Sequence, residues 1–394
     1  MTCGGFASVK KHRLSNTFWR SHLLTLGRID YRLVLILGAL MSISLLVISS
    51  TTTEMHELEW SSIFTPYVKK QLQFFAAGWG LFFLLSQFDY CKLREWTWIL
   101  YGVMIVLLVG LFFVPSIQNV HRWYRLGSFT FQPSEYAKLI VVVALSWFLE
   151  KNGDKARSRM TAWGAFGIVG LPFLLILKQP DLGTALVLFP IALVIFYFGG
   201  IKKRILATMA SCALVGLACV SLVFLGLISH ESLRPVATKI LKDYQYERFN
   251  PNTYHQKAAI TAIALGGMTG TGWHKSAYTK RQWLPAAHTD SVFPAFAEEF
   301  GMLGVIGLLS LFFGLIYVSF QVTAVAKDRF GRLLSAGIAI YLAMHIMVNL
   351  GMMTGFLPIT GVPLVMVSYG GSSILATMGA LGILQSIYSR RFTF

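Results

Sequence analysis

The chain has 394 residues, of which 55% are hydrophobic and only 13% are charged, and its formal net charge is +17. A soluble protein of this length cannot hide so much apolar surface in one core, so the composition excludes an ordinary soluble domain. The net charge suggests nucleic-acid binding. The basic residues are placed as signals of membrane topology, however, and we expect no nucleic-acid partner.

Ten apolar runs follow one another along the chain. Membrane-spanning helices need about 20 apolar residues, because the hydrocarbon layer is about 30 Å thick. The runs are continuous and not alternating, which favours helices over barrel strands. The sequence therefore predicts an all-α membrane protein, a polytopic bundle of about ten transmembrane helices. The runs are Leu33–Ser50, Gln71–Leu85, Trp96–Pro115, Tyr136–Leu149, Met160–Leu177, Leu182–Gly199, Ile205–Ile228, Met302–Val325, Leu333–Met353 and Pro363–Ile387.

Lysine and arginine residues are concentrated in the connections on one side of the predicted membrane. With the N-terminus inside, 20 of the 34 basic residues fall on the inner side. The short outer loops hold only Lys69, Lys70, Arg122 and Arg125. Because positive residues accumulate in cytoplasmic loops, we expect a multi-pass protein of the bacterial inner membrane with both termini in the cytoplasm. The first run begins too far from the start for a signal peptide, so no cleavage is expected.

One connection is much longer than the others. Residues 229–301 form an extracytoplasmic loop with a mixed composition, and loops of this length usually carry function or are disordered. The predicted organisation is a basic cytoplasmic tail (1–32), helices one to seven (33–228), this loop (229–301), helices eight to ten (302–387) and a short cytoplasmic tail (388–394).

Two pairs of ionisable residues lie at the outer ends of predicted helices. Glu135 and Lys138 are three residues apart at the start of the fourth helix, and Lys178 and Asp181 are three apart around the end of the fifth. A charged side chain near the bilayer costs free energy, so its presence indicates a structural or functional role. One interpretation is two salt bridges that lock the helix ends. The other is a polar recess that opens outward and holds an anionic headgroup.

The long loop contains two further motifs. Gly266–Gly272 is rich in glycine, but Trp273 stands where a P-loop requires lysine, and a structural turn is favoured over a phosphate-binding nest. His288, Thr289 and Asp290 allow three interpretations. Thr289 or Asp290 caps a helix, the His-x-Asp pair contributes to a metal site, or Asp290 is a general base with a raised pKa.

At these residues the sequence resembles the SEDS (shape, elongation, division and sporulation) family of cell-wall polymerases. The resemblance covers most of the chain, and the motifs occur in the same order on ten spans. They are Phe131–Glu135 with Lys138, Gln179–Thr184, His288–Asp290 followed by Glu298–Gly301, Gly355–Leu364 and Val367–Ser373.

Other features of the sequence indicate the subfamily and depart from the family pattern. Ile29–Tyr31, and Asp243–Gln245 with Arg248, look more like RodA, the elongation protein, than like FtsW, the division protein. Ala286 stands where the family usually has glutamate, Ala262–Gly267 departs from the usual loop sequence, and Pro294 is unusual. These departures leave Asp290 in place.

The resemblance implies a peptidoglycan glycosyltransferase that polymerises lipid II, the undecaprenyl-diphosphate-linked disaccharide-peptide, on the outer face of the membrane. It assigns Asp290 as the catalytic base. A class B penicillin-binding protein is the implied partner, since the chain has no transpeptidase domain. Cations must hold the diphosphate, either basic side chains or a divalent metal ion such as Mg²⁺ or Mn²⁺. The expected substrate-binding residues are Glu135, Lys138, Asp181, Arg248, Arg122, His288 and Thr289.

Two alternative functions compete with the polymerase. A flippase for the lipid-linked precursor predicts ionisable groups near mid-membrane, and His345 and Asn349, one turn apart on the ninth helix, are candidates. Hydrogen bonds between helices explain them equally well. A non-catalytic scaffold for the penicillin-binding protein predicts tolerance of Asp290→Ala.

Overall fold

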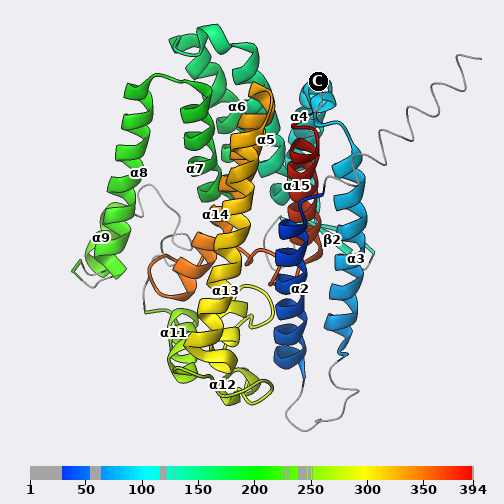
Figure 1. Ribbon diagram of the computed structural model, residues 1–394. Coiled ribbons are helices and arrows are strands. Elements are labelled where there is room, and N and C mark those ends of the chain that lie inside the picture. Colours follow the sequence, from blue (N-terminus) through cyan, green and yellow to red (C-terminus); the bar gives the residue numbers. More distant parts are fainter. Residues whose placement is uncertain are drawn as a thin grey trace, which may run out of the picture.

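The computed structural model describes residues 29–53, 64–115, 122–127, 129–224, 227–228, 230–237, 246, 250 and 252–392. Within this part of the chain, ten helices have 18 residues or more and pack into one bundle (Figure 1). The predicted all-α architecture is thereby confirmed. The long helices are α2 (Tyr31–Thr52), α3 (Pro66–Gln87), α4 (Leu93–Gly110), α5 (Pro133–Lys151), α6 (Arg159–Lys178), α7 (Leu182–Gly199), α8 (Lys203–Phe224), α13 (Val292–Val325), α14 (Arg329–Met353) and α15 (Gly371–Ser389).

Seven helical segments in the described residues are long and apolar enough to cross a membrane. They are α2, α4 with its short 3₁₀ extensions (Tyr90–Phe113), α6, α7, α8, α13 and α14. The helices α3, α5 and α15 have 22, 19 and 19 residues. These three are long enough to span with their flanks, and more polar residues lie along them, as expected for helices that carry a polar site inside a bundle.

Helices α14 and α8 differ strongly in the share of their residues that is buried. In the most apolar stretch of α14, 78% of the residues are buried, whereas in the most apolar stretch of α8 none is. Figure 1 shows the same arrangement, with α14 inside the bundle and α8 at its left edge. Polar side chains on α14 therefore lie in the protein interior, where each needs a partner.

One predicted boundary was wrong and another was incomplete. The eighth helix was expected to begin at Met302, which follows the non-helical Gly301, but α13 also includes a helical segment before this kink, from Val292. The tenth was expected from Pro363, but α15 begins at Gly371. Residues 354–370 instead form an irregular segment, which includes Met366 at a φ of 60° and Gly361 at a φ of 77°. Local hydropathy did not reveal that this apolar segment is non-helical.

The glycine-rich motif is a structural turn, as favoured by the sequence. Gly270 has a φ of 79°, and a Cβ atom there would lie 2.1 Å from the carbonyl oxygen of Glu299. Gly301, with a φ of 62°, packs equally closely on Gly270. Backbone hydrogen bonds from Thr271 to Glu298 (2.9 Å) and from Met302 to Gly267 (2.9 Å) join the turn to the α13 kink. Only glycine permits this approach.

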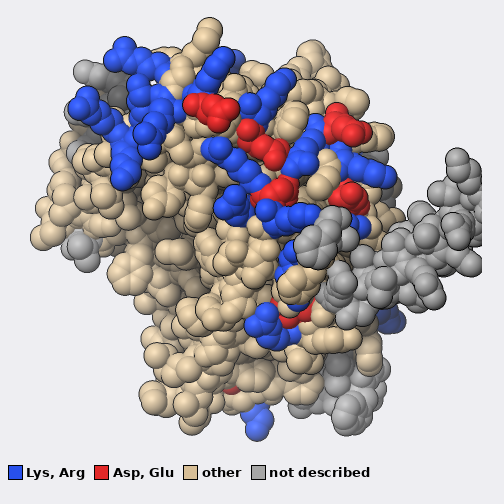
Figure 2. Space-filling model, turned by 45° about the horizontal axis from the view of Figure 1, so that its top comes forward, with Lys and Arg blue, Asp and Glu red and all other residues tan. Residues whose placement is uncertain are grey.

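Basic residues gather at one end of the bundle, which Figure 2 turns toward the viewer. Contacts place the connections α3–α4, α5–α6 and α13–α14 together there. Arg94 pairs with Glu150 at 2.8 Å and also with Asp328, and Arg329 donates to the carbonyl of Gly199 at 2.9 Å. Away from the basic end lie the hairpin of β1 (Tyr124–Leu126) and β2 (Phe129–Phe131) and the short helix α9 (His230–Ala237), and α11 (Tyr254–Gly266) and α12 (Ala277–Lys280) lie farthest from it (Figure 1).

Candidate functional site

The site lies at the end of the bundle opposite the basic end, where three helices begin. Helix α5 starts at Pro133 directly after the hairpin, and proline is favoured at a first helical position because its missing N–H is not needed there. Helix α7 starts after Asp181, which is its N-cap. Helix α13 starts after Asp290 and Ser291. These starts bring the polar residues of three distant sequence motifs into one region.

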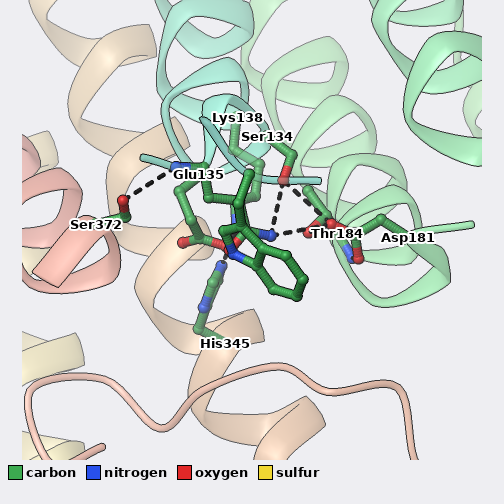
Figure 3. Close-up of polar contacts among 9 residues, drawn as sticks. Ser134, Glu135, Lys138, Asp181, Thr184, His345 and Ser372 are labelled. Atoms are coloured by element: carbon green, nitrogen blue, oxygen red, sulfur yellow. Dashed lines mark hydrogen bonds and ion pairs between the residues drawn. The ribbon is translucent and has the colours of Figure 1, made fainter. Parts of the chain in front are cut away.

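Asp181 is buried and fully occupied by hydrogen bonds (Figure 3). One carboxylate oxygen accepts from Gln132 Nε2 at 3.2 Å, Ser134 Oγ at 3.1 Å and Thr184 Oγ1 at 2.9 Å. The other accepts from the backbone N–H of Thr184 at 3.4 Å. The suggested salt bridge with Lys178 is wrong, because Lys178 is exposed and Asp181 takes neutral donors instead. Asp181 thus locks the start of α7 to the start of α5.

The suggested pair of Glu135 and Lys138 is present, and it has a third member. Lys138 Nζ donates to Glu135 Oε1 at 2.7 Å and lies 2.6 Å from His345 Nε2 on α14 (Figure 3). Since an ammonium group only donates, His345 Nε2 must accept. Lys138 is 1% exposed. Its ammonium group is therefore buried inside the bundle beside Glu135 and His345, and its contact with diphosphate stays a prediction.

Arg122 lies just before the hairpin and is half-buried. Its guanidinium donates to the backbone carbonyl of Gln179 at 3.3 Å and to that of Pro180. These bonds tie the hairpin to the α6–α7 turn and leave the charge beside the site. Arg248 and the RodA-like motif Asp243–Gln245 lie outside the described residues.

Asp290 is half-buried in the turn that precedes α13, and among the described residues its carboxylate accepts no hydrogen bond. Burial raises the pKa of Asp290 from 3.8 to about 6, the positive charge of Arg122 opposes the rise, and the negative charge of Asp181 adds to it. The helix-cap interpretation is wrong, because the N-cap of α13 is Ser291. A carboxylate with free lone pairs and a pKa near neutrality has the properties of a general base.

The residues before Asp290 are held by the segment before α15. Ser368 Oγ donates to the carbonyl of Thr289 at 2.7 Å, and the N–H of Tyr369 donates to the carbonyl of His288 at 2.9 Å. The ring of His288 packs on Tyr67 (centroids 5.0 Å apart), and burial lowers the pKa of His288, so it is neutral at pH 7. Sequence reasoning did not identify Tyr67 or the role of Ser368, because neither has a local signal.

The carboxylates of Glu298 and Glu299 bind the loop at residues 276–279 and do not face Asp290. Glu298 accepts from the backbone N–H groups of Tyr278 (2.9 Å) and Thr279 (3.1 Å), and Glu299 accepts from Ser276 Oγ at 2.9 Å. Both carboxylates therefore fix α12 against α13. The two glutamates of this motif therefore have a structural explanation in this chain.

The described residues do not fit a metal ion held by the protein alone. A resident cation needs several oxygen or nitrogen ligands that converge on one point. Across the described ranges, no three His, Cys, Asp or Glu side chains come together in this way. The carboxylate of Asp181 is moreover already used by hydroxyl and amide donors. We therefore assign no step to a protein-held cation.

A family model described as "Cell cycle protein", for FtsW, RodA and SpoVE, matches residues 29–392. The chain belongs to this family. It is 31% identical to the peptidoglycan glycosyltransferase MrdB of Escherichia coli over 377 residues, which cover 95% of this chain and 96% of that protein. It is also 31% identical to the stage V sporulation protein E of Bacillus subtilis over 370 residues, 92% of this chain and 98% of that one.

Solved structures of the family share the fold. A chain from a peptidoglycan synthase complex that coordinates polymerization and crosslinking matches with a TM-score of 0.70 and 28% identity, over 93% of this chain and 99% of that chain. The rod shape determining protein RodA of Thermus thermophilus matches with a TM-score of 0.66 and 28% identity, over 93% and 98%. The predicted SEDS family and enzyme class are confirmed, and MrdB and RodA among the matches favour the RodA-like assignment.

The departures from the SEDS pattern are accommodated locally. Ala286 has a φ of 51° and an exposed side chain, and its carbonyl accepts the N–H groups of Thr289 (3.0 Å) and Ser291 (3.1 Å), so the turn closes without the usual glutamate. Pro294 lies in the first turn of α13, where backbone N–H groups have no intrahelical partner. Neither change displaces Asp290 from the site.

Proposed function

We propose that this SEDS protein is a peptidoglycan glycosyltransferase that polymerises lipid II into glycan strands for cell elongation and shape. The observation that carries the proposal is Asp290, a half-buried carboxylate with no hydrogen-bond donor among the described residues and a pKa of about 6. It lies beside the positive charge of Arg122, in the turn that precedes α13.

The charge distribution supports the orientation that this function needs. Basic residues concentrate at the end that holds the α3–α4, α5–α6 and α13–α14 connections, and this end faces the cytoplasm by the positive-inside rule. The inner membrane of a bacterium is the corresponding location, with both termini inside. Asp290 then lies on the extracytoplasmic side.

The reaction joins the 4-hydroxyl oxygen of one saccharide to the anomeric carbon of another. Asp290 takes the proton of the hydroxyl as the new C–O bond forms, and the bond between the anomeric carbon and the diphosphate breaks. The lipid diphosphate leaves with the electron pair, and its charge is stabilised by Arg122 and, in our proposal, Arg248. A positioned base of this kind contributes roughly 10²–10⁴-fold.

The remaining site residues act on the geometry and the charge around Asp290. Asp181 fixes the starts of α5 and α7 and raises the pKa of Asp290 through its charge. Glu135 and Lys138 hold α5 against α14 from within. His288 and Thr289 lie directly beside the base and contact the bound saccharide in this proposal. A divalent cation, if the diphosphate brings one, would be held chiefly by the substrate.

A class B penicillin-binding protein is the partner that we propose. Glycan strands must be crosslinked, and the described residues form a helical bundle with no transpeptidase domain among them. The match to a chain from a synthase complex that coordinates polymerization and crosslinking supports this partnership. The lipid-facing sides of α13 and α14 and the extracytoplasmic loops are the surfaces at which the partner would dock.

The direct test is the purified protein with lipid II, alone and with a class B penicillin-binding protein, while contaminating polymerases are inhibited. We expect glycan strands on a denaturing gel. A flippase would move fluorescent precursor across sealed vesicles without lengthening it, and a scaffold would do neither. Absence of strands under both conditions would overturn the proposal.

The pH dependence of this activity should report Asp290. The base acts when deprotonated, so kcat/KM should fall about tenfold for each pH unit below about 6 and level off above it. In Asp181→Asn the negative charge that raises the pKa of Asp290 is lost, while Arg122 still lowers it, so the acid limb should move to lower pH. Asp154→Asn, an exposed site at the basic end, is the matched control and should leave the limb unchanged.

A further inference from the structure

Asn349 is a buried amide on the central helix α14, one turn beyond His345, and the mechanism above does not use it. Its Nδ2 atom donates to two backbone carbonyls, that of Asp290 at 3.0 Å and that of Val362 at 2.7 Å. The two carbonyls belong to segments far apart in the sequence, the turn before α13 and the irregular segment before α15. One side chain therefore joins α14 to both.

The orientation of this amide follows from its partners. Carbonyl oxygens only accept, so the NH₂ group must face them and both of its hydrogens are used. The Oδ1 atom is left buried without a hydrogen-bond partner among the described residues. A buried unpaired oxygen lowers stability. A buried polar group that lowers folding stability is typical of a functional site, where the position of a reacting group matters more than stability.

The second carbonyl, that of Val362, belongs to the residue next to Gly361, which the Asp290 carboxylate approaches. Val362 follows Gly361, and a Cβ atom on Gly361 would lie 3.4 Å from Asp290 Oδ2. The carboxylate therefore lies close to Gly361, on the side where a larger residue would place its side chain. Asn349 holds the backbone of Asp290 on one side of this contact and the backbone of Val362 on the other.

We propose that Asn349 is a positioning residue for the transfer reaction, which fixes the carboxylate of Asp290 against Gly361 by binding the carbonyls of Asp290 and Val362. The inference rests on the proposed function, because it assumes that Asp290 is the base. The bond from Ser368 to Thr289 holds the preceding residue, but it does not reach the backbone at 290. Without Asn349 the turn keeps its fold and the carboxylate loses its fixed place.

Polymerisation kinetics of the full-length protein with lipid II test this proposal in Asn349→Leu, which removes the donors at similar volume, and in Asn349→Ala. We expect kcat per folded molecule to fall about 10²-fold, because a displacement of about 1 Å costs that much, while KM stays within about twofold. The acid limb of the pH profile should also move to lower pH, since a loosened carboxylate gains water while Arg122 and Asp181 still face it.

Ser335→Ala is the matched control, because Ser335 is equally buried on α14 but its hydroxyl donates to Gly331 of the same helix at 2.7 Å. It should retain full kcat. If the Asn349 variants melt earlier but keep kcat and the pH profile, Asn349 is only structural and the proposal is overturned. Should they fail to fold, Gly361→Ala tests the same contact, and undiminished kcat in that variant overturns the proposal. An active Asp290→Asn protein would instead refute the proposed function.

Discussion

Asp290→Asn is expected to abolish glycan polymerisation, with a loss of roughly 10²–10⁴-fold in kcat. The substitution keeps the size of the side chain and the backbone hydrogen bond from Asn349 (3.0 Å) and removes the oxygen that takes the proton. The measurement is the initial rate of strand formation from lipid II by purified protein. Asp154→Asn, at the exposed basic end, should polymerise at the wild-type rate.

The same substitution should not unfold the protein. The pKa shift of Asp290 determines whether its charge raises or lowers the folding stability. The pKa of Asp290 is raised in the folded state, from 3.8 to about 6, so its ionisation lowers stability as pH rises through this range. At pH 8 the neutral Asn therefore removes an unfavourable charge, and the melting temperature in detergent should equal or exceed that of the wild type. Strand synthesis by a folded Asp290→Asn protein would contradict the assignment of the base.

The sequence predicted the number of long helices because each apolar run carries its own signal. It also placed the polar motifs at one end, since Glu135, Asp181 and Asp290 all follow or precede a run on the same side. What it could not predict depends on distant contacts. Residues 363–370 were expected to begin the tenth helix, but they belong to the irregular segment 354–370. Asn349 donates to Val362 within this segment, and Ser368 and Tyr369 of the segment donate to Thr289 and His288.

In the candidate site, too, some features could be predicted from the sequence and others depend on contacts between distant helices. The sequence could single out Asp290 as a candidate because a lone carboxylate near an apolar surface is unusual, and its raised pKa follows from burial. Spacing of three residues correctly predicted the pair of Glu135 and Lys138, but not its third member, His345 on α14. It wrongly suggested Lys178 for Asp181, which binds Ser134 of another helix. Spacing within one helix says nothing about which helix packs against it.

The buried pair of Glu135 and Lys138 gives the second large expected effect. Lys138→Met keeps the length of the side chain and leaves the Glu135 carboxylate buried without a counter-charge. Its Oε1 loses the 2.7 Å bond, and its Oε2 already has no hydrogen-bond partner among the described residues. Removing one partner of a buried ion pair costs about 3–5 kcal/mol, so we expect a large drop in melting temperature and in the yield of folded protein.

The double variant Glu135→Gln with Lys138→Met distinguishes this cause from lost packing. It removes both charges, and replacement of a whole buried pair is often neutral or stabilising, so most of the lost stability should return. Lys178→Met is the matched control, because Lys178 is exposed at the end of α6, and it should change stability by no more than about 0.5 kcal/mol. Thermal unfolding in detergent measures all three. A single variant as stable as the wild type, or a double variant no more stable than the single, would show that the pair does not hold α5 to α14 through its charges.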